Sequence, residues 1–329
     1  MLPKAHQPVI LRHSTMNSIS PRRARRRWPI ALLTFAFLFA TGFTVVRANM
    51  LGIGERFDRL TSRIEAFVDP PPDRSTIPTV VVTPAPSATP SPTPRVTLAP
   101  SASPTPSPTP LVRTPVDVAV VDDHPAVFAT QLTDKDCAVA ATQMVLTILG
   151  LGNSSPQFQQ EIHDRIGEWE SWEDSHNGGW GPAAVSLALA AYGEPGYQIR
   201  AYSSYTDALR DSAIAITEMD KPVLMFPWWG AHTWVMTGFR ADADPTLFAD
   251  ATISGAYILD PWYPRFSSIW GQSDGPGNFE DMAELERNWP AFQGPTGYEQ
   301  IGPGWTRPEG AYPDRDGRFV LLIPTTPRS

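Results

Sequence analysis

Four side chains, far apart in the 329-residue sequence, have the types that nucleophilic attack on a carbonyl carbon requires. Cys137 is the only cysteine, and it lies at the start of a predicted helix, where free backbone N–H groups and the helix dipole favour the nucleophilic thiolate. His232 opens a predicted strand and offers the imidazole that a thiol needs as its general base. Asp260 ends another predicted strand and could orient that imidazole. Gln131, six residues before Cys137, could donate an amide N–H to an oxyanion.

Each of these residues also has an ordinary structural explanation. A lone cysteine often fills a core as a small apolar side chain, and an Asp-Pro pair such as Asp260-Pro261 is common in turns. A single cysteine excludes an intramolecular disulfide and a thiolate zinc site. The spacing of His163, His176 and nearby acids matches no metal-ligand pattern, so we predict no metal and no cofactor.

The order Gln–Cys–His–Asp resembles that of the papain-like cysteine peptidases, in which a glutamine stands six positions before the cysteine. More narrowly, the chain is similar to the bacteriocin-processing, double-glycine leader peptidases and their stand-alone relatives. The similarity runs from about Phe128 to Pro324. It is carried by Gln131–Gly150, Gly179–Gly193, Lys221–Phe226, His232–Gly238, Ile258–Pro261 and a helix over Phe279–Trp289.

The resemblance implies that Cys137 is the nucleophile, His232 the base and then the acid, Asp260 the orienting carboxylate and Gln131 the oxyanion donor. It also puts the acidic, aromatic loop over 168–180 near the cleft, so Trp180 is a candidate wall of a substrate groove. Trp229, three residues before His232, is a second candidate. Tryptophans that pack an irregular core would look the same in the sequence.

The chain departs from the family pattern at three points. Ala138 follows the cysteine where the family has glycine, and an insertion over 240–255 lengthens the gap from His232 to Asp260. That insertion carries acids that could compete with Asp260, namely Asp242, Asp244 and Asp250. The sequence also lacks the phosphate-binding loop of the exporters to which the processing peptidases are fused, so export is not its expected task.

The order of predicted elements indicates an α+β fold of the papain-like type, with N-terminal helices followed by a mostly antiparallel sheet. Helical spacing and capping residues predict helices over 136–150, 155–166, 182–192 and 205–219. Short β-type runs follow at 222–226, 233–239, 256–259 and 318–323. We expect one peptidase domain over 117–329, which holds ten of the eleven tryptophans.

The N-terminal part indicates a membrane anchor. Residues 1–27 carry seven basic side chains and no acidic one, and residues 28–46 are 19 uncharged, largely apolar residues. Such a helix is close to the bilayer thickness, and the arginines before it favour a cytoplasmic N-terminus and an extracytoplasmic domain. The alternative is a cleaved signal peptide and secretion.

Two segments separate the predicted anchor from the domain. Within residues 47–68, the run 53–67 has apolar side chains at helical spacing and predicts an amphipathic juxtamembrane helix. Residues 69–116 are rich in Pro, Ser and Thr, contain an imperfect repeat, and predict an extended stalk. They account for much of the excess in the chain's 36 prolines.

We therefore predict a membrane-anchored, extracytoplasmic cysteine peptidase of bacterial type that acts on peptides or proteins. The net charge of −8 argues against a nucleic-acid partner, and the oligomeric state is left open. Two alternatives remain. One is an inactive module of the same fold that binds a peptide or a cell-wall fragment, and the other is a thiol amidase or transpeptidase.

Overall fold

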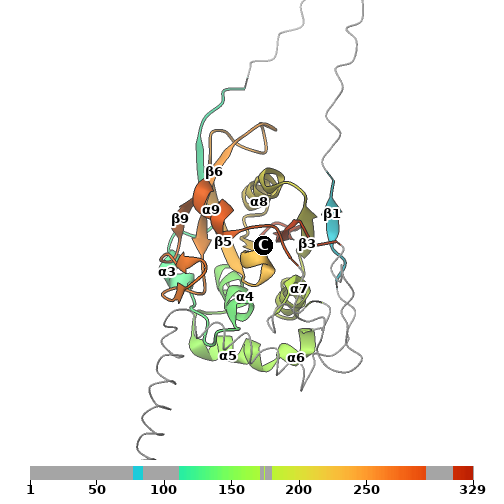
Figure 1. Cartoon of the computed structure of the whole chain (residues 1–329), viewed down its shortest axis with the longest axis vertical. Helices are drawn as coiled ribbons and strands as arrows, with labels where there is room; N and C mark the ends of the chain where they lie inside the picture. The colour runs from blue at the N-terminus through green and yellow to red at the C-terminus, as the bar shows by residue number, and fades with distance from the viewer. Residues whose placement is uncertain (1–76, 84–110, 171–173, 175–179, 294–313, 329) are drawn as a thin grey trace, which may run out of the picture. The chain divides into compact units, whose positions relative to one another are not determined.

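The computed structural model describes residues 77–83, 111–170, 174, 180–293 and 314–328 (Figure 1). The predicted basic segment, hydrophobic segment and juxtamembrane helix lie outside these residues, as does most of the predicted stalk. Within the described part of the chain, no helix is both long and apolar enough to cross a bilayer. The anchor over 28–46 thus stays a prediction.

The described part contains a mixed sheet that runs through its centre. Its strands lie in the order β1 (Val80–Val82), β3 (Tyr197–Tyr202), β10 (Phe319–Pro324), β4 (Val223–Met225), β5 (Trp234–Ala241), β6 (Ile253–Leu259) and β9 (Asn278–Asp281). A further strand, β2 (Val116–Ala119), pairs with β5. All pairings in this sheet are antiparallel except that of β1 with β3. The predicted α+β class with a mostly antiparallel sheet is confirmed.

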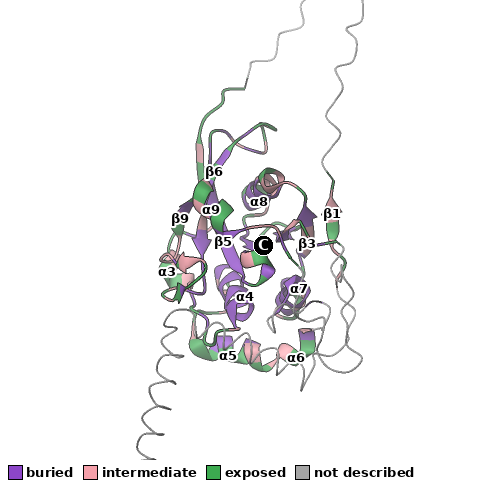
Figure 2. Cartoon of the chain, in the orientation of Figure 1, coloured by how far each residue is buried: buried purple, intermediate pink, exposed green. Residues whose placement is uncertain are grey.

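Alternation along the central strands divides the core into two layers. In β10, Val320 and Leu322 pack in one cluster, whereas Leu321 and Ile323 pack in the other. The first cluster includes helices α4 (Cys137–Ile148) and α7 (Pro182–Ala191), and the second includes α8 (Tyr205–Met219) and α9 (Met282–Asn288). Side chains of a strand point alternately to opposite faces, so this pattern places helices on both sides of the sheet. Figure 2 shows the buried strands between them.

Smaller elements complete the described chain. They are α3 (His124–Val127), α5 (Pro156–Asp164), α6 (Ile166–Trp169), a 3-10 turn η3 (Trp228–Gly230) and a separate two-stranded ribbon of β7 (Phe266–Ser267) and β8 (Gly271–Gln272). As predicted from Ser155-Pro156, α5 begins with a serine cap, whose hydroxyl accepts from the N–H of Phe158 at 3.2 Å. The helices predicted over 136–150, 182–192 and 205–219 correspond to α4, α7 and α8.

Helix α4 is the most deeply buried helix. All of its residues except Thr147 are buried, which agrees with the expected helix packed on most sides. Small residues such as Ala138 and Ala141, both fully buried, let neighbouring elements approach it closely. A helix enclosed in this way holds its first residue, Cys137, in a fixed position.

The structure differs from the predicted stalk at its N-terminal part. Val80–Val82 do not lie in a solvated stalk but pair in parallel with Arg200–Tyr202 of β3. Thr79, just before this strand, accepts a hydrogen bond from the Arg315 guanidinium at 3.1 Å. Three successive valines have high β propensity, and β3 offers them an open edge.

Two further differences concern strands. Residues 279–281, the start of the predicted helix Phe279–Trp289, instead belong to β9, and helix α9 begins only after its cap, Asp281. Strand β3 was not predicted at all, although it lies next to β10 and is largely buried. Its partners are distant in the sequence, so its local pattern alone gave a weak signal.

Candidate active site

Cys137 is the first residue of α4, and the turn before it is fixed by hydrogen bonds. The side chain of Asp136 accepts from the backbone N–H of Thr133 at 3.0 Å and lies 2.9 Å from Nδ1 of His163. The thiol side chain is only 8% exposed. As a first-turn group, the backbone N–H of Cys137 has no acceptor within its own helix and is free to face a developing oxyanion.

A left-handed turn leads into His232. Trp228, Trp229 and Gly230 all have positive φ angles, of 57°, 60° and 91°. A Cβ atom at Gly230 would lie 2.2 Å from the ring of Phe292, so only glycine fits the space as well as the backbone. The N–H of His232 donates to the Pro227 carbonyl at 3.3 Å, which closes the turn immediately before β5.

His232 and Asp260 meet because their strands are antiparallel neighbours. Val235 of β5 lies opposite Leu259 of β6, so the start of β5 is beside the end of β6. Nε2 of His232 lies 2.6 Å from Oδ1 of Asp260, and both side chains are buried. Asp260 Oδ1 also accepts from the N–H of Trp262 at 2.8 Å. The predicted pair is therefore present as a short, buried contact.

The electrostatics of this pair favour charged partners. Burial acts to lower the pKa of His232, but the Asp260 carboxylate outweighs it, with a smaller contribution from Cys137, and raises the pKa to about 9. Burial acts to raise the pKa of Asp260, but the imidazolium and hydrogen bonds from Ser273 and Trp262 lower it. Because Asp260 occupies Nε2, Nδ1 is the ring nitrogen that remains for an interaction with Cys137.

Tryptophans enclose the imidazole, a feature that the sequence reasoning missed. The ring of Trp228 stacks on His232, with centroids 4.0 Å apart and planes inclined by 16°, and Trp262 meets the same imidazole edge-on at 6.4 Å. Trp270 stacks in turn on Trp228 at 6.0 Å. These rings limit rotation of the imidazole and keep water from the His232–Asp260 contact. The only sequence signal was the Trp-Trp pair before His232.

Gln131 is buried at the turn that leads into Cys137. Its Nε2 donates to the Thr133 carbonyl at 2.8 Å, and the backbone N–H of Asp136 faces the same carbonyl at 3.4 Å. Its own backbone N–H donates to the Pro261 carbonyl, directly after Asp260. Nε2 has a second amide hydrogen, and the role of Gln131 as an oxyanion donor stays a prediction.

The two predicted groove tryptophans have different environments. Trp180 is 4% exposed and packs edge-on against Trp169 in the core, with centroids 5.6 Å apart, so its assignment to a groove wall is withdrawn. Trp229 is 39% exposed and meets Trp270 edge-on at 4.8 Å. Trp229 therefore remains a surface residue beside the His232 turn.

The acids of the 240–255 insertion do not approach His232. Asp242 and Asp250 both pair with Arg113, at 2.8 and 2.9 Å. Asp244 accepts from the N–H and the hydroxyl of Thr246. Asp260 is thus the carboxylate that contacts the imidazole.

No protein-family model matches the chain, and no curated protein matches its sequence. The functional argument therefore depends on the geometry of Cys137, His232 and Asp260.

Proposed function

We propose that this chain is a thiol hydrolase of the papain-like type that cleaves peptide bonds. The observation that supports this proposal best is the His232–Asp260 contact of 2.6 Å between buried side chains, with Cys137 contributing to the raised pKa of the same imidazole. An inactive binding module would have no need of all three groups in this order.

The proposed reaction has two halves, acylation of Cys137 and hydrolysis of the resulting thioester, and His232 transfers a proton in each. The sulfur of Cys137 attacks the peptide carbonyl carbon, and the Cys137 and Gln131 N–H groups stabilise the oxyanion. The C–N bond breaks as the His232 imidazolium gives its proton to the leaving amine. His232 then takes a proton from water, the hydroxide attacks the thioester, and the C–S bond breaks to release the Cys137 thiolate and the carboxylic acid product. Asp260 stays ionised and orients the imidazole.

The surface beside this triad suggests a preference for apolar side chains. Trp229 is 39% exposed and meets Trp270, which stacks on the Trp228 ring over His232. We propose that Trp229 contacts the substrate on one side of the scissile bond.

We further propose that the enzyme acts outside the cytoplasm on peptides or proteins, held to the membrane by residues 28–46. This proposal depends on the sequence alone, through the basic segment 1–27 and the uncharged run that follows it. Protease protection of the intact chain in vesicles, probed from each side, tests it. Digestion of the domain from the cytoplasmic side would contradict it.

The activity is tested with a mixture of short peptides and mass spectrometry of the products. The full-length protein should hydrolyse a subset of them, and Cys137→Ser should abolish hydrolysis. Asp242→Asn is the matched control, because it changes an exposed aspartate outside the site. Formation of a new amide when an amine is added would favour transpeptidation, and hydrolysis that survives Cys137→Ser would exclude a thiol mechanism.

A further inference from the structure

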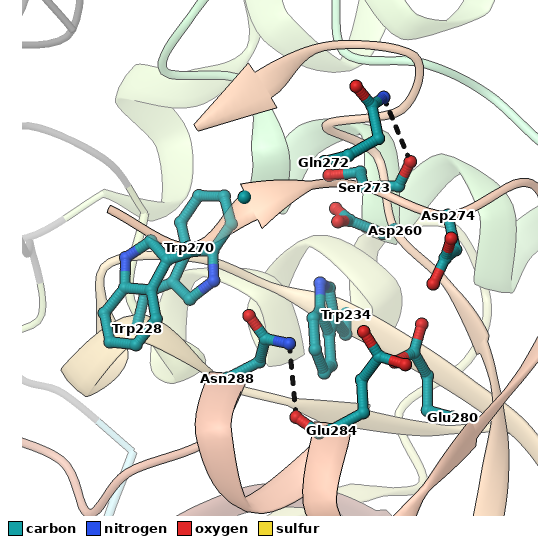
Figure 3. Close-up of a pocket in the computed structure, with 11 residues that line it drawn as sticks. Trp228, Trp234, Asp260, Trp270, Gln272, Ser273, Asp274, Glu280, Glu284 and Asn288 are labelled. Carbon is teal, nitrogen blue, oxygen red and sulfur yellow. Dashed lines mark hydrogen bonds between the residues drawn. The ribbon is translucent and has the colours of Figure 1, made fainter. Parts of the chain in front are cut away.

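Three acidic side chains converge in a pocket behind Asp260, on the side of the sheet that carries α9. Asp274 comes from the loop after β8, Glu280 from β9 and Glu284 from α9. One carboxylate oxygen from each lies within 4.8 Å of the other two. Figure 3 shows these carboxylates near one another, with Asp260 and Trp234 beside them. Three like charges this close must share a cation or a proton.

Two buried polar atoms at this pocket have no partner in the described part of the chain. Glu280 is 5% exposed, and its Oε2 receives no hydrogen bond. Trp234, which is 3% exposed and lines the same pocket, has an indole N–H without an acceptor. Buried polar groups are rarely left unpaired, because each such group costs roughly 1–3 kcal/mol. Both atoms are therefore available to a ligand bound in this pocket.

Charge compensation from the protein reaches only the rim of the cluster. Arg287 pairs with Glu284 at 2.6 Å, and its side chain is 59% exposed. Among the described residues, no lysine or arginine pairs with Asp274 or Glu280. Asp274 and Glu280 thus have no cationic partner among the described residues. The neighbouring Asp260 is paired with the His232 imidazolium.

We propose that Asp274, Glu280 and Glu284 bind a hard divalent cation, with Ca²⁺ as the best match, and that the Trp234 N–H donates to a water molecule on that cation. Carboxylate oxygens are the ligands that Ca²⁺ and Mg²⁺ prefer. Ca²⁺ holds its ligands at about 2.3–2.6 Å, so ligand oxygens in its shell lie up to roughly 5 Å apart. The observed spread fits that shell, with open positions left for water.

The cation would support the proposed active site without touching the substrate. Ser273 lines the same pocket as Asp260 and helps to lower the pKa of its carboxyl, and Asp274 is the next residue. A cation held by Asp274 together with β9 and α9 would therefore fix the loop that supports the orienting carboxylate. This gives the cluster a positioning role that is separate from the chemistry at Cys137.

A proton is the competing occupant of the cluster. Burial, followed by the charges of Glu284 and Asp274, raises the pKa of Glu280 to about 9. A protonated Glu280 would also relieve the repulsion. The two occupants differ in a measurable way, because only the cation site responds to Ca²⁺ and to chelators.

The test uses the full-length protein in mild detergent, freed of metal with a chelator. Tb³⁺, a Ca²⁺ substitute, is added and its luminescence is excited through tryptophan, since Trp234 lies at the site. We expect a saturable signal that Ca²⁺ displaces with a Kd of about 10⁻³ M or tighter, and Mg²⁺ displaces less well. Glu280→Gln and Asp274→Asn should each weaken Ca²⁺ binding at least about tenfold. Glu286→Gln, an exposed residue of α9, is the matched control and should leave it unchanged.

Three outcomes would overturn the proposal. One is the absence of a Ca²⁺-displaceable signal, and another is an equal loss of signal in Glu286→Gln, which would indicate unspecific surface binding. The third is a Glu280→Gln protein that is more heat-stable than the wild type while Ca²⁺ stabilises neither, as a protonated cluster requires. If Glu280→Gln does not fold, Ca²⁺ binding by Asp274→Asn tests the proposal, and unchanged binding by that variant would overturn it. Because binding is measured without a peptide substrate, failure here leaves the proposed peptidase activity to be judged separately.

Discussion

At the scale of single residues, the 2.6 Å contact of His232 with Asp260 joins two buried side chains that keep each other charged. The pKa of His232 rises to about 9 and that of Asp260 falls. The contribution of His232 to stability is thus complete below its unfolded pKa of about 6.5 and is lost as the pH rises through about 9. The contribution of Asp260 is present above about pH 4 and is lost as the pH falls through its folded pKa.

Asp260→Asn should reveal this pH dependence. It leaves the size of the side chain unchanged but removes the charge that faces the imidazolium. We expect it to lower the free energy of unfolding by about 3 kcal/mol or more between pH 4 and 6.5, and by less as the pH approaches 9. Urea denaturation of both proteins across this range measures the difference. A difference that grows toward pH 9 would be incompatible with an ion pair.

Trp228→Ala should separate shielding of the imidazole from substrate contact. It removes the ring that stacks on His232 at 4.0 Å, so the imidazole gains freedom and water. We expect slower alkylation of Cys137 and a loss of stability of more than about 1 kcal/mol. Trp229→Ala, in the same turn but exposed, should leave alkylation unchanged and raise KM for peptides. Equal effects of the two changes on alkylation would argue against shielding by Trp228.

The residue types of the site could be predicted from the sequence, but their environment could not. Cys137 at a helix start and Asp260 at a strand end are local signals. The stack of Trp228 on His232 depends on a left-handed turn, and the burial of Trp180 depends on contacts with a distant part of the core. Neither leaves a local pattern, which is why Trp180 was placed wrongly and Trp228 was missed.

At the scale of elements, the turn η3 fixes the position of His232 relative to the rest of the fold. Gly230→Ala would put a methyl group against the ring of Phe292 and would strain a residue at φ 91°. We expect the free energy of unfolding to fall by about 1–3 kcal/mol. We also expect slower alkylation of Cys137, because His232 lies only two residues after Gly230. Thermal unfolding and alkylation rates measure the two effects.

Gly193→Ala is the control for this change. Gly193 has a similar φ of 99°, but a Cβ atom there would meet nothing within 4 Å. Gly193→Ala should lower the free energy of unfolding only by the cost of the backbone strain, and it should leave the alkylation rate of Cys137 unchanged. If the two glycine variants behaved alike in both measurements, the close contact of Gly230 with Phe292 would have no role in placing His232.

Elements with strong local signals were predicted well. The serine cap with proline at the first position marks α5, and apolar spacing marks α4 and α8. Strand β9 was read as helix because its residues run directly into a helical pattern, and β3 was missed. Their strand conformation is set by partners in β6 and β10, which lie far away in the sequence.

At the scale of the whole molecule, the pairing of Val80–Val82 with β3 makes a segment of the predicted stalk part of the domain. A fragment that begins at residue 111 lacks this strand and exposes the β3 edge. We expect it to unfold at a lower temperature than a fragment that begins at residue 70, by at least about 2–4 °C for each kcal/mol lost.

An internal deletion of ten residues within 84–110 serves as the control. Because loop closure depends only weakly on length, this deletion should change the unfolding temperature little. If the fragments that begin at 70 and 111 were equally stable, β1 would contribute nothing to the domain.

The account as a whole is tested most directly by the alkylation rate of Cys137 as a function of pH in the full-length protein, with His232→Ala alongside. Near pH 6 an ordinary thiol is almost entirely protonated and reacts slowly. We predict that Cys137 reacts well above the rate of a cysteine peptide at this pH, and that His232→Ala lowers its rate to about that of the peptide. A wild-type rate no faster than that of the peptide at pH 6, unchanged by His232→Ala, would contradict the proposed catalytic pairing.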